Sequence, residues 1–92
     1  MSILIVGGND RMVSQYRFIC EKYRCKVKIF TQMPKDFKSR IGRPDLLILF
    51  TGTVSHQMVL NATQEVSKDT TKIVRSHSSS CNALKNILKE HL

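Results

Sequence analysis

Two histidines in similar settings are the residues in this sequence best suited to bind a ligand. His56 follows Ser55 and His77 follows Ser76, and each pair lies between a predicted strand and a predicted helix. The positive end of a helix dipole disfavours the imidazolium ion, so we expect both rings to be neutral, which is the form that binds metals. The pattern therefore predicts ligands for a divalent metal or an axial bond to haem iron.

The same two loops allow other interpretations. Each histidine could be a polar loop residue that hydrogen-bonds to the backbone, or a metal site could take one histidine from each subunit of a dimer. Met58 and Cys81 follow the two histidines closely enough to be considered as further ligands. A hydrolase would instead use Ser55, Ser76 or a neighbouring serine as its nucleophile and a histidine as its base. We rank that interpretation last, because no G-x-S-x-G turn is present and because helix caps and turns explain most of these serines.

A glycine-containing turn, Gly7-Gly8-Asn9-Asp10-Arg11, follows the first apolar run and offers a second place for a ligand. It lacks the third glycine of a dinucleotide-binding turn, contains an acid that would repel phosphate, and has no Walker-type lysine. We expect the glycines to permit a tight turn and Asp10 to cap the following helix. Arg11 is expected to point toward the ligand cleft, as an anion clamp or a hydrogen-bond donor.

Cysteine usage and the apolar runs indicate the compartment. Three cysteines, an odd number without metal-finger spacing, argue against a disulfide framework and fit a reducing cytoplasm. Cys20 and Cys81 are expected on apolar helix faces, and Cys25, at the start of a strand, is expected to be partly exposed. The longest apolar run, 46–50, is far shorter than the roughly 20 residues of a membrane helix. We therefore expect a soluble cytoplasmic protein without a signal peptide.

Hydrophobic patterns predict the elements that must position these side chains. Residues 45–50 form a continuous apolar run, which indicates a central strand covered on both faces. Residues 26–30 alternate between charged and apolar side chains, as a strand at or near the edge of a sheet does. Apolar residues at helical spacing lie between the strands. The expected strands are 2–6, 26–30, 45–50 and 72–75, and the expected helices are 10–24, 34–41, a segment capped by Ser55 and a segment after the serines of 76–80.

This alternation predicts an α/β fold with right-handed crossovers, in which helices cover both faces of a four-stranded parallel sheet. We expect a Rossmann-like or flavodoxin-like three-layer sandwich with strand order 2-1-3-4. In such sheets ligands bind at the carboxyl ends of the strands, near the point where the strand order reverses. The residues expected at this ligand site are Gly7, Gly8, Asn9, Arg11, Thr51, Ser55, His56, Ser76 and His77.

The length of the chain predicts one domain. Its 92 residues, 41% hydrophobic and 24% charged, fit a single domain over residues 1–92. A core of this size has little margin and dimerisation adds stability, so we expect a homodimer. Exchange of an element between two subunits is a low-cost route to such a dimer, and the turns 51–53 and 76–80 are the candidate hinges.

The chain is strongly basic. Fifteen Lys and Arg residues against seven Asp and Glu give a formal net charge of +8, and most of the excess lies between Arg11 and Arg43. Such a charge attracts anions, so nucleic acid, an acidic protein and an anionic cofactor are all candidate partners. The alternative is an ordinary solvated surface, since no recognition motif or exposed run of aromatic residues accompanies the charge.

Three motifs give the chain a family resemblance. They are Ile3-Leu4-Ile5-Val6-Gly7-Gly8, Asp45-Leu46-Leu47-Ile48 with Thr51 and Val54-Ser55-His56, and Ser76-His77-Ser78-Ser79 with Leu84. In this order and spacing, across nearly the whole chain, the sequence resembles the bacterial family called domain of unknown function 2325. The resemblance implies a small, dimeric α/β protein from a family in which haem binding occurs. Family members commonly have Thr-Asp after the third strand, whereas this chain has Thr51-Gly52, so an acid-base role there loses support.

These observations lead to three hypotheses. The first is a non-enzymatic cofactor-binding or sensor module that holds haem or a divalent metal through His56 or His77, with gas or redox sensing as its function. Arg11 would lie near the open face, and the basic charge would suit the two anionic propionates of haem. The second is a regulatory domain that binds a nucleotide, a phosphate or nucleic acid, and it predicts affinity that falls steeply with salt. The third is a small hydrolase.

Overall fold

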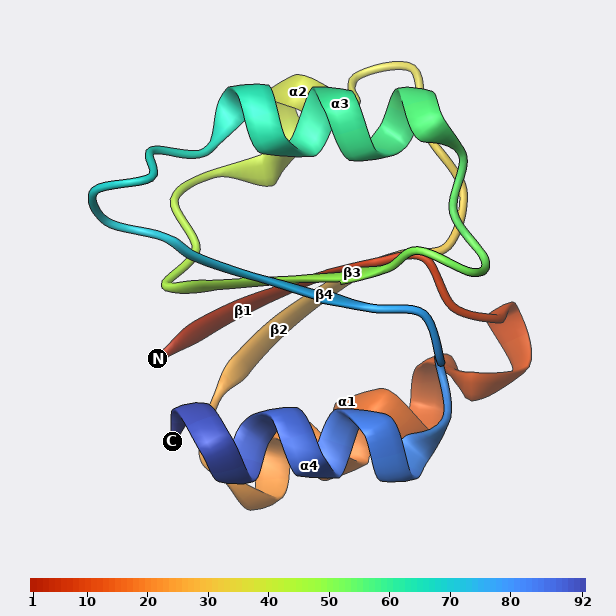
Figure 1. The fold of residues 1–92 in the computed structure, drawn as a ribbon, viewed down its shortest axis with the longest axis vertical. Helices are drawn as coiled ribbons and strands as arrows, with labels where there is room; N and C mark the ends of the chain where they lie inside the picture. Colours follow the sequence, from red (N-terminus) through yellow and green to blue (C-terminus); the bar gives the residue numbers. More distant parts are fainter.

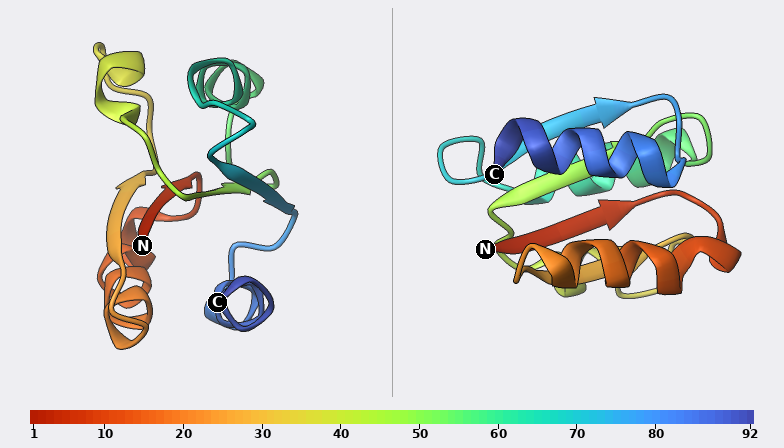
Figure 2. Two further views of the ribbon diagram at one scale, coloured as in Figure 1. Left: turned by 90° about the vertical axis from the view of Figure 1, so that its left-hand side faces the viewer. Right: turned by 90° about the horizontal axis from the view of Figure 1, so that it is seen from below.

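The sheet has the predicted topology. The computed structural model describes residues 1–92, and its four parallel strands lie in the order β2-β1-β3-β4. The strands are β1 (Ser2–Val6), β2 (Lys26–Phe30), β3 (Leu46–Phe50) and β4 (Lys72–Ser76). Because neighbouring strands are all parallel, the four carboxyl ends lie at the same edge of the sheet (Figure 2).

Strands β1 and β3 form the centre of the sheet. Ile5 of β1 pairs with Ile29 on one side and with Ile48 on the other. All five residues of β3 are buried, as its unbroken apolar run predicts. The outer strands β2 and β4 are only partly covered, which confirms the edge position predicted for residues 26–30.

Helices cover both faces of this sheet. They are the 3₁₀ turn η1 (Asp10–Met12) and the helices α1 (Val13–Lys22), α2 (Phe37–Ile41), α3 (His56–Glu65) and α4 (Cys81–His91). Helices α1 and α4 lie side by side on one face, and α2 and α3 lie on the other (Figures 1 and 2). With helices on both faces of the sheet, the protein is the predicted three-layer α/β sandwich. None of the helices combines the length and the apolar composition that crossing a membrane would require.

Two separate cores fill the spaces between the layers. Successive residues of a strand point to opposite faces, so Ile5 packs beneath α1 and α4 whereas Leu4 packs beneath α2 and α3. In the first core the ring centroids of Tyr16 and Phe50 lie 5.5 Å apart. This contact joins α1 to the carboxyl end of β3, close to the predicted ligand site.

Two helices differ from the prediction in their bounds. The expected helix 10–24 begins as the 3₁₀ turn η1, and its α-helical part ends at Lys22. Helix α2 begins at Phe37 rather than at Pro34, and it ends at Ile41, just before Gly42, as predicted. Phe37 and Ile41 are the buried residues of α2, so this short helix forms only where its side chains pack against the second core.

Cys25 is buried, which contradicts the expectation of partial exposure. Only 7% of the residue is accessible. The preceding residue, Arg24, has a φ of 57°, and this left-handed conformation turns the chain after α1 so that Cys25 packs into the first core. Tyr23, at the carboxyl end of α1, remains 37% exposed.

Candidate functional site

Three loops carry the predicted site residues, and the sheet brings them to one edge. Residues 7–11 follow β1, residues 51–55 join β3 to His56 at the start of α3, and residues 77–80 follow Ser76, the last residue of β4. Since β1, β3 and β4 are consecutive neighbours in the sheet, their loops are neighbours too. The Gly8 amide donates a hydrogen bond to Thr53 Oγ1 at 2.7 Å and so joins the first loop to the second.

The first loop requires glycine where it crosses the core. Gly8 has a φ of +91°, and a Cβ atom there would lie 2.8 Å from the ring of Tyr16. The amide of the preceding Gly7 donates to the Phe30 carbonyl at 2.8 Å, which ties the start of the loop to β2. The backbone therefore turns tightly, as predicted, and lies directly on the tyrosine ring.

The cap of the first helical turn is Asn9, which corrects the prediction that Asp10 has this role. Asn9 has the extended backbone that a cap requires, and its Oδ1 accepts a hydrogen bond from the Arg11 amide at 2.9 Å. Asp10 is already inside the turn, and its carboxylate accepts hydrogen bonds from Thr31 Oγ1 and, at 3.5 Å, from Gln32 Nε2. Side chains of the protein thus occupy the position at which this turn could bind an anion.

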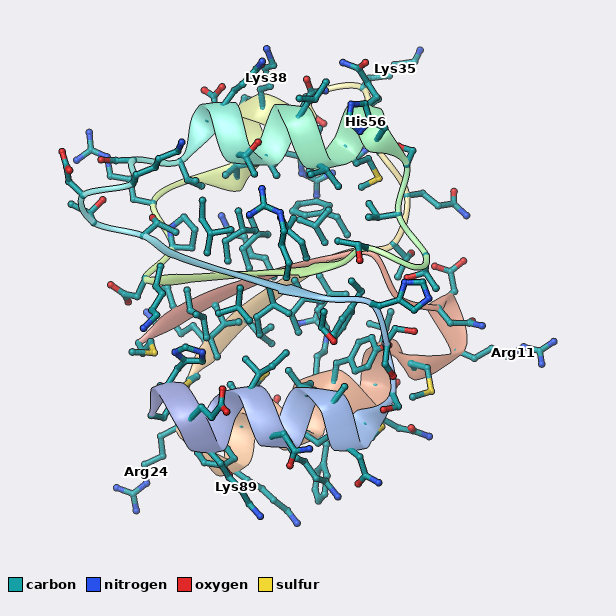
Figure 3. The ribbon with its side chains drawn as sticks, viewed as in Figure 1. Arg11, Arg24, Lys35, Lys38, His56 and Lys89 are labelled. Carbon is teal, nitrogen blue, oxygen red and sulfur yellow. The ribbon has the colours of Figure 1, made fainter.

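Arg11 is exposed at the same edge of the sheet. Figure 3 shows its side chain extending outward from the body of the molecule into solvent rather than across the neighbouring loops. Its guanidinium is accordingly free to meet an anion that approaches this edge from outside.

Ser55 and His56 form the start of α3. Ser55 Oγ accepts a hydrogen bond from the Met58 amide at 3.2 Å, which confirms the predicted cap. His56 is the first residue of the helix and is exposed, on the side of the sheet covered by α2 and α3 (Figure 3). A ligand held by His56 would therefore lie toward that layer.

His77 lies against the loop that follows β3. A Cβ atom at Gly52 would be 3.2 Å from Cε1 of His77 and 2.5 Å from its carbonyl oxygen, so glycine makes room for the histidine. The Thr51 amide donates to the Ser76 carbonyl at 2.8 Å and holds the two loops together. His77 itself is exposed. The predicted residues Thr51, Ser76 and His77 are thus neighbours in the structure.

The serines of the last loop bond to one another and to the backbone rather than to a histidine. Ser76 Oγ donates to the Ser78 carbonyl at 2.8 Å, and Ser78 Oγ donates to Ser80 Oγ at 3.2 Å. Ser80 Oγ accepts from the Ala83 amide at 3.1 Å and caps α4. The activated serine of a hydrolase needs a hydrogen bond to a base, and these hydroxyls serve as caps and turn formers instead.

Tyr16 belongs to the site, although its sequence position predicts only a core residue. Its hydroxyl donates to the Ser79 carbonyl at 2.5 Å and so ties α1 to the loop of His77. Burial raises the pKa of the Tyr16 phenol, because a desolvated environment disfavours the phenolate. The only signal in the sequence is a tyrosine, with its polar tip, on an otherwise apolar stripe.

The further metal ligands considered from the sequence point elsewhere. Met58 is buried in the second core, and Cys81 Sγ contacts Gln15 Oε1 at 3.1 Å in the layer of α1 and α4. No group of three His, Cys, Asp or Glu side chains lies together in a way that could hold a metal ion. His56 and His77 are therefore the candidate ligands that the carboxyl edge presents.

The structure defines a small parallel α/β domain, and the carboxyl edge of its sheet has capped loops and two exposed histidines. The model of one protein family, described as an uncharacterized protein conserved in bacteria (DUF2325), matches residues 2–91. Because the match spans nearly the whole chain, the protein belongs to this family, as the resemblance predicts. No curated protein and no solved structure matches the chain.

Proposed function

We propose that this protein is a non-enzymatic binding module that holds haem at the carboxyl edge of its sheet. The observation that carries the proposal is His77, an exposed imidazole that lies against Gly52 while the serines around it make the hydrogen bonds of the loop. An imidazole with no internal hydrogen bond can coordinate iron without losing a contact in the folded chain.

The small number of metal-ligating side chains at the carboxyl edge of the sheet suits haem. Haem iron takes one or two axial ligands from a protein, whereas a zinc ion takes three or four. One histidine, or one histidine from each of two chains, can supply the smaller number. When bound, the iron would provide the chemistry of gas or redox sensing, and the contribution of this chain would be the axial ligand and its position.

A second copy of the chain would complete such a site. The main hollows of the single chain are lined by other residues, so a haem bound to His77 alone would leave one face of its ring in water. One histidine from each of two chains would cover both faces, which supports a homodimer. Arg11, which extends from the same edge, suits an anionic propionate.

Two other functions have weaker support. Phosphate binding would use helix N-termini, but Asn9, Ser55 and Ser80 already cap those of η1, α3 and α4. Nucleic-acid binding is favoured by a single basic face, whereas the basic side chains occur on both helical layers: Figure 3 shows Lys38 on one and Lys89 on the other.

Titration of the purified protein with hemin, followed by absorbance, tests the proposal. We expect a shifted Soret band that is lost in His77→Ala, and a change in the His56→Ala spectrum would identify a second ligand. His91→Ala is the matched control, because His91 lies at the far end of α4 beside Glu90, with 3.9 Å between Nε2 and Oε2. If the His56→Ala/His77→Ala double variant binds hemin with the wild-type spectrum, the proposal is wrong.

The oligomeric state provides an independent test of the shared site. Size-exclusion chromatography coupled to light scattering should show that the haem-loaded protein is a dimer, with one or two haems bound per dimer. A loaded monomer with an intact spectrum would contradict the two-chain site while leaving haem binding in place. Steeply salt-dependent binding of an oligonucleotide, without hemin binding, would favour the nucleic-acid alternative.

A further inference from the structure

The outer face of the layer of α1 and α4 has an apolar groove that the proposed haem site does not use. The groove has a volume of about 450 Å³, and its apolar lining comes from Phe18, Ile19, Tyr23 and Cys81. Phe18 is 60% exposed, more than any other large hydrophobic residue of the chain. The Nζ atom of Lys22 lies over the Phe18 ring, 4.6 Å from the ring centroid. An exposed aromatic ring at the rim of a groove is a feature of sites that bind a partner.

The rim of this groove is uniformly basic. Lys22 contributes from α1, and Lys85 and Lys89 contribute from α4, where successive lysines are one helical turn apart. The acidic residues of these two helices, Glu21 and Glu90, are not among the residues that line the groove. A ligand in the groove therefore meets an apolar floor and three positive charges.

We propose that the groove binds an acidic amphipathic helix from a partner protein. Such a helix buries apolar residues spaced three and four apart and carries its charged residues along the edges of the groove, where Asp and Glu would meet the three lysines. The groove follows α1 from Ser14 to Tyr23, a helical length of about 14 Å, which matches between two and three turns of a bound helix.

Charge distinguishes this occupant from the two main alternatives. A second copy of the chain seated on the same groove would bring two sets of Lys22, Lys85 and Lys89 together, and like charges at an interface oppose association. Nucleic acid would neutralise the lysines but would leave the apolar lining around Ile19 without a matching surface. An acidic amphipathic helix satisfies both parts of the groove.

A designed pair of peptides tests this proposal. One fluorescein-labelled peptide of about three helical turns has leucine on one face and glutamate elsewhere, and the second has the same composition in an order that destroys the apolar face. Fluorescence anisotropy should show the first binding at least about tenfold more tightly than the second, with affinity that falls as salt rises. Equal binding of the two peptides would overturn the proposal, because it would show attraction by net charge alone.

Two groove variants and a control of equal charge locate the binding surface. Phe18→Ser and the triple variant K22E/K85E/K89E should each weaken binding of the amphipathic peptide by about tenfold or more. The control K35E/K38E/K68E changes the net charge by the same amount outside the groove and should weaken binding much less. Comparable losses in the groove and control triples would refute the assignment, and circular dichroism confirms that each variant is folded.

Cys81 provides a readout that does not depend on charge. It lines the groove and is half-buried, whereas Cys20 and Cys25 are buried. The bound peptide should slow alkylation of Cys81 by iodoacetamide in the folded protein, and unchanged alkylation at saturating peptide would contradict the proposal. Two further results would replace it: an oligonucleotide that displaces the peptide and depends on Phe18, or self-association of the peptide-free protein that Phe18→Ser abolishes.

Discussion

Tyr16→Phe removes one hydroxyl and leaves the rest of a buried ring in place. The hydroxyl donates to the Ser79 carbonyl at 2.5 Å, and Tyr16 is 0% exposed, so the substitution deletes a hydrogen bond without opening a large cavity. Ser79 is only half-buried, and water can therefore replace part of the lost contact. We expect the free energy of unfolding to fall by about 1 kcal/mol, within the range of about 0.5 to 3 kcal/mol for such a deletion.

Urea unfolding followed by circular dichroism measures this loss, and native-state hydrogen exchange measures the order of residues 76–80. Tyr23→Phe is the matched control, because Tyr23 is 37% exposed and lies at the end of α1. The control should stay within about 0.5 kcal/mol of the wild type. If Tyr16→Phe behaves like the control in both measurements, the conclusion that Tyr16 holds the loop of His77 is refuted.

Substitutions at three further positions test other parts of the structure. Burial raises the pKa of the Cys20 thiol from 9.0 to about 11. The contribution of this thiol to the free energy of unfolding is therefore complete below about pH 9 and is lost as pH rises toward 11. In urea unfolding over this pH range, Cys20→Ala should lose less stability than the wild type. Gly8→Ala places a Cβ atom 2.8 Å from the ring of Tyr16 at a φ of +91°. Thermal unfolding should show that the free energy of unfolding falls by about 1–3 kcal/mol. An unchanged unfolding midpoint would contradict this prediction. Ser80→Ala removes the cap of α4 and should cost about 1 kcal/mol in the same assay, most of which Ser80→Asp should restore.

The sheet was predictable because each strand has a distinct pattern. The unbroken apolar run of β3 requires cover on both faces, and the alternation in β2 fits only an edge. The turn after α1 was not predictable in the same way. It depends on the left-handed backbone of Arg24, and arginine, unlike glycine or asparagine, gives no sign of that conformation. The burial of Cys25 follows from this turn and was missed with it.

In the candidate site, too, contacts between residues close in the sequence were predictable, whereas contacts between distant residues were not. The caps made by Ser55 and Ser80 involve residues three apart, so the sequence alone predicts Ser55 as one cap and places the other within the serine loop 76–80. Asn9 and Asp10 can both cap a helix, and only their backbone conformations decide between them. The bond from Tyr16 joins residues 63 apart in the sequence, and no local pattern predicts such a pairing.

Helix α1 contributes to both proposed sites through opposite faces. Successive residues of a helix differ by about 100° in direction, so the buried Tyr16 faces the sheet and the histidine loop, whereas Phe18 faces the solvent and the groove. The substitutions Phe18→Ser and His77→Ala therefore alter separate surfaces. Loss of peptide binding with an intact hemin spectrum in the first variant, and the reverse in the second, would establish that the two sites act independently. If Phe18→Ser also removed the hemin spectrum while the protein stayed folded, the separation of the two faces would be wrong.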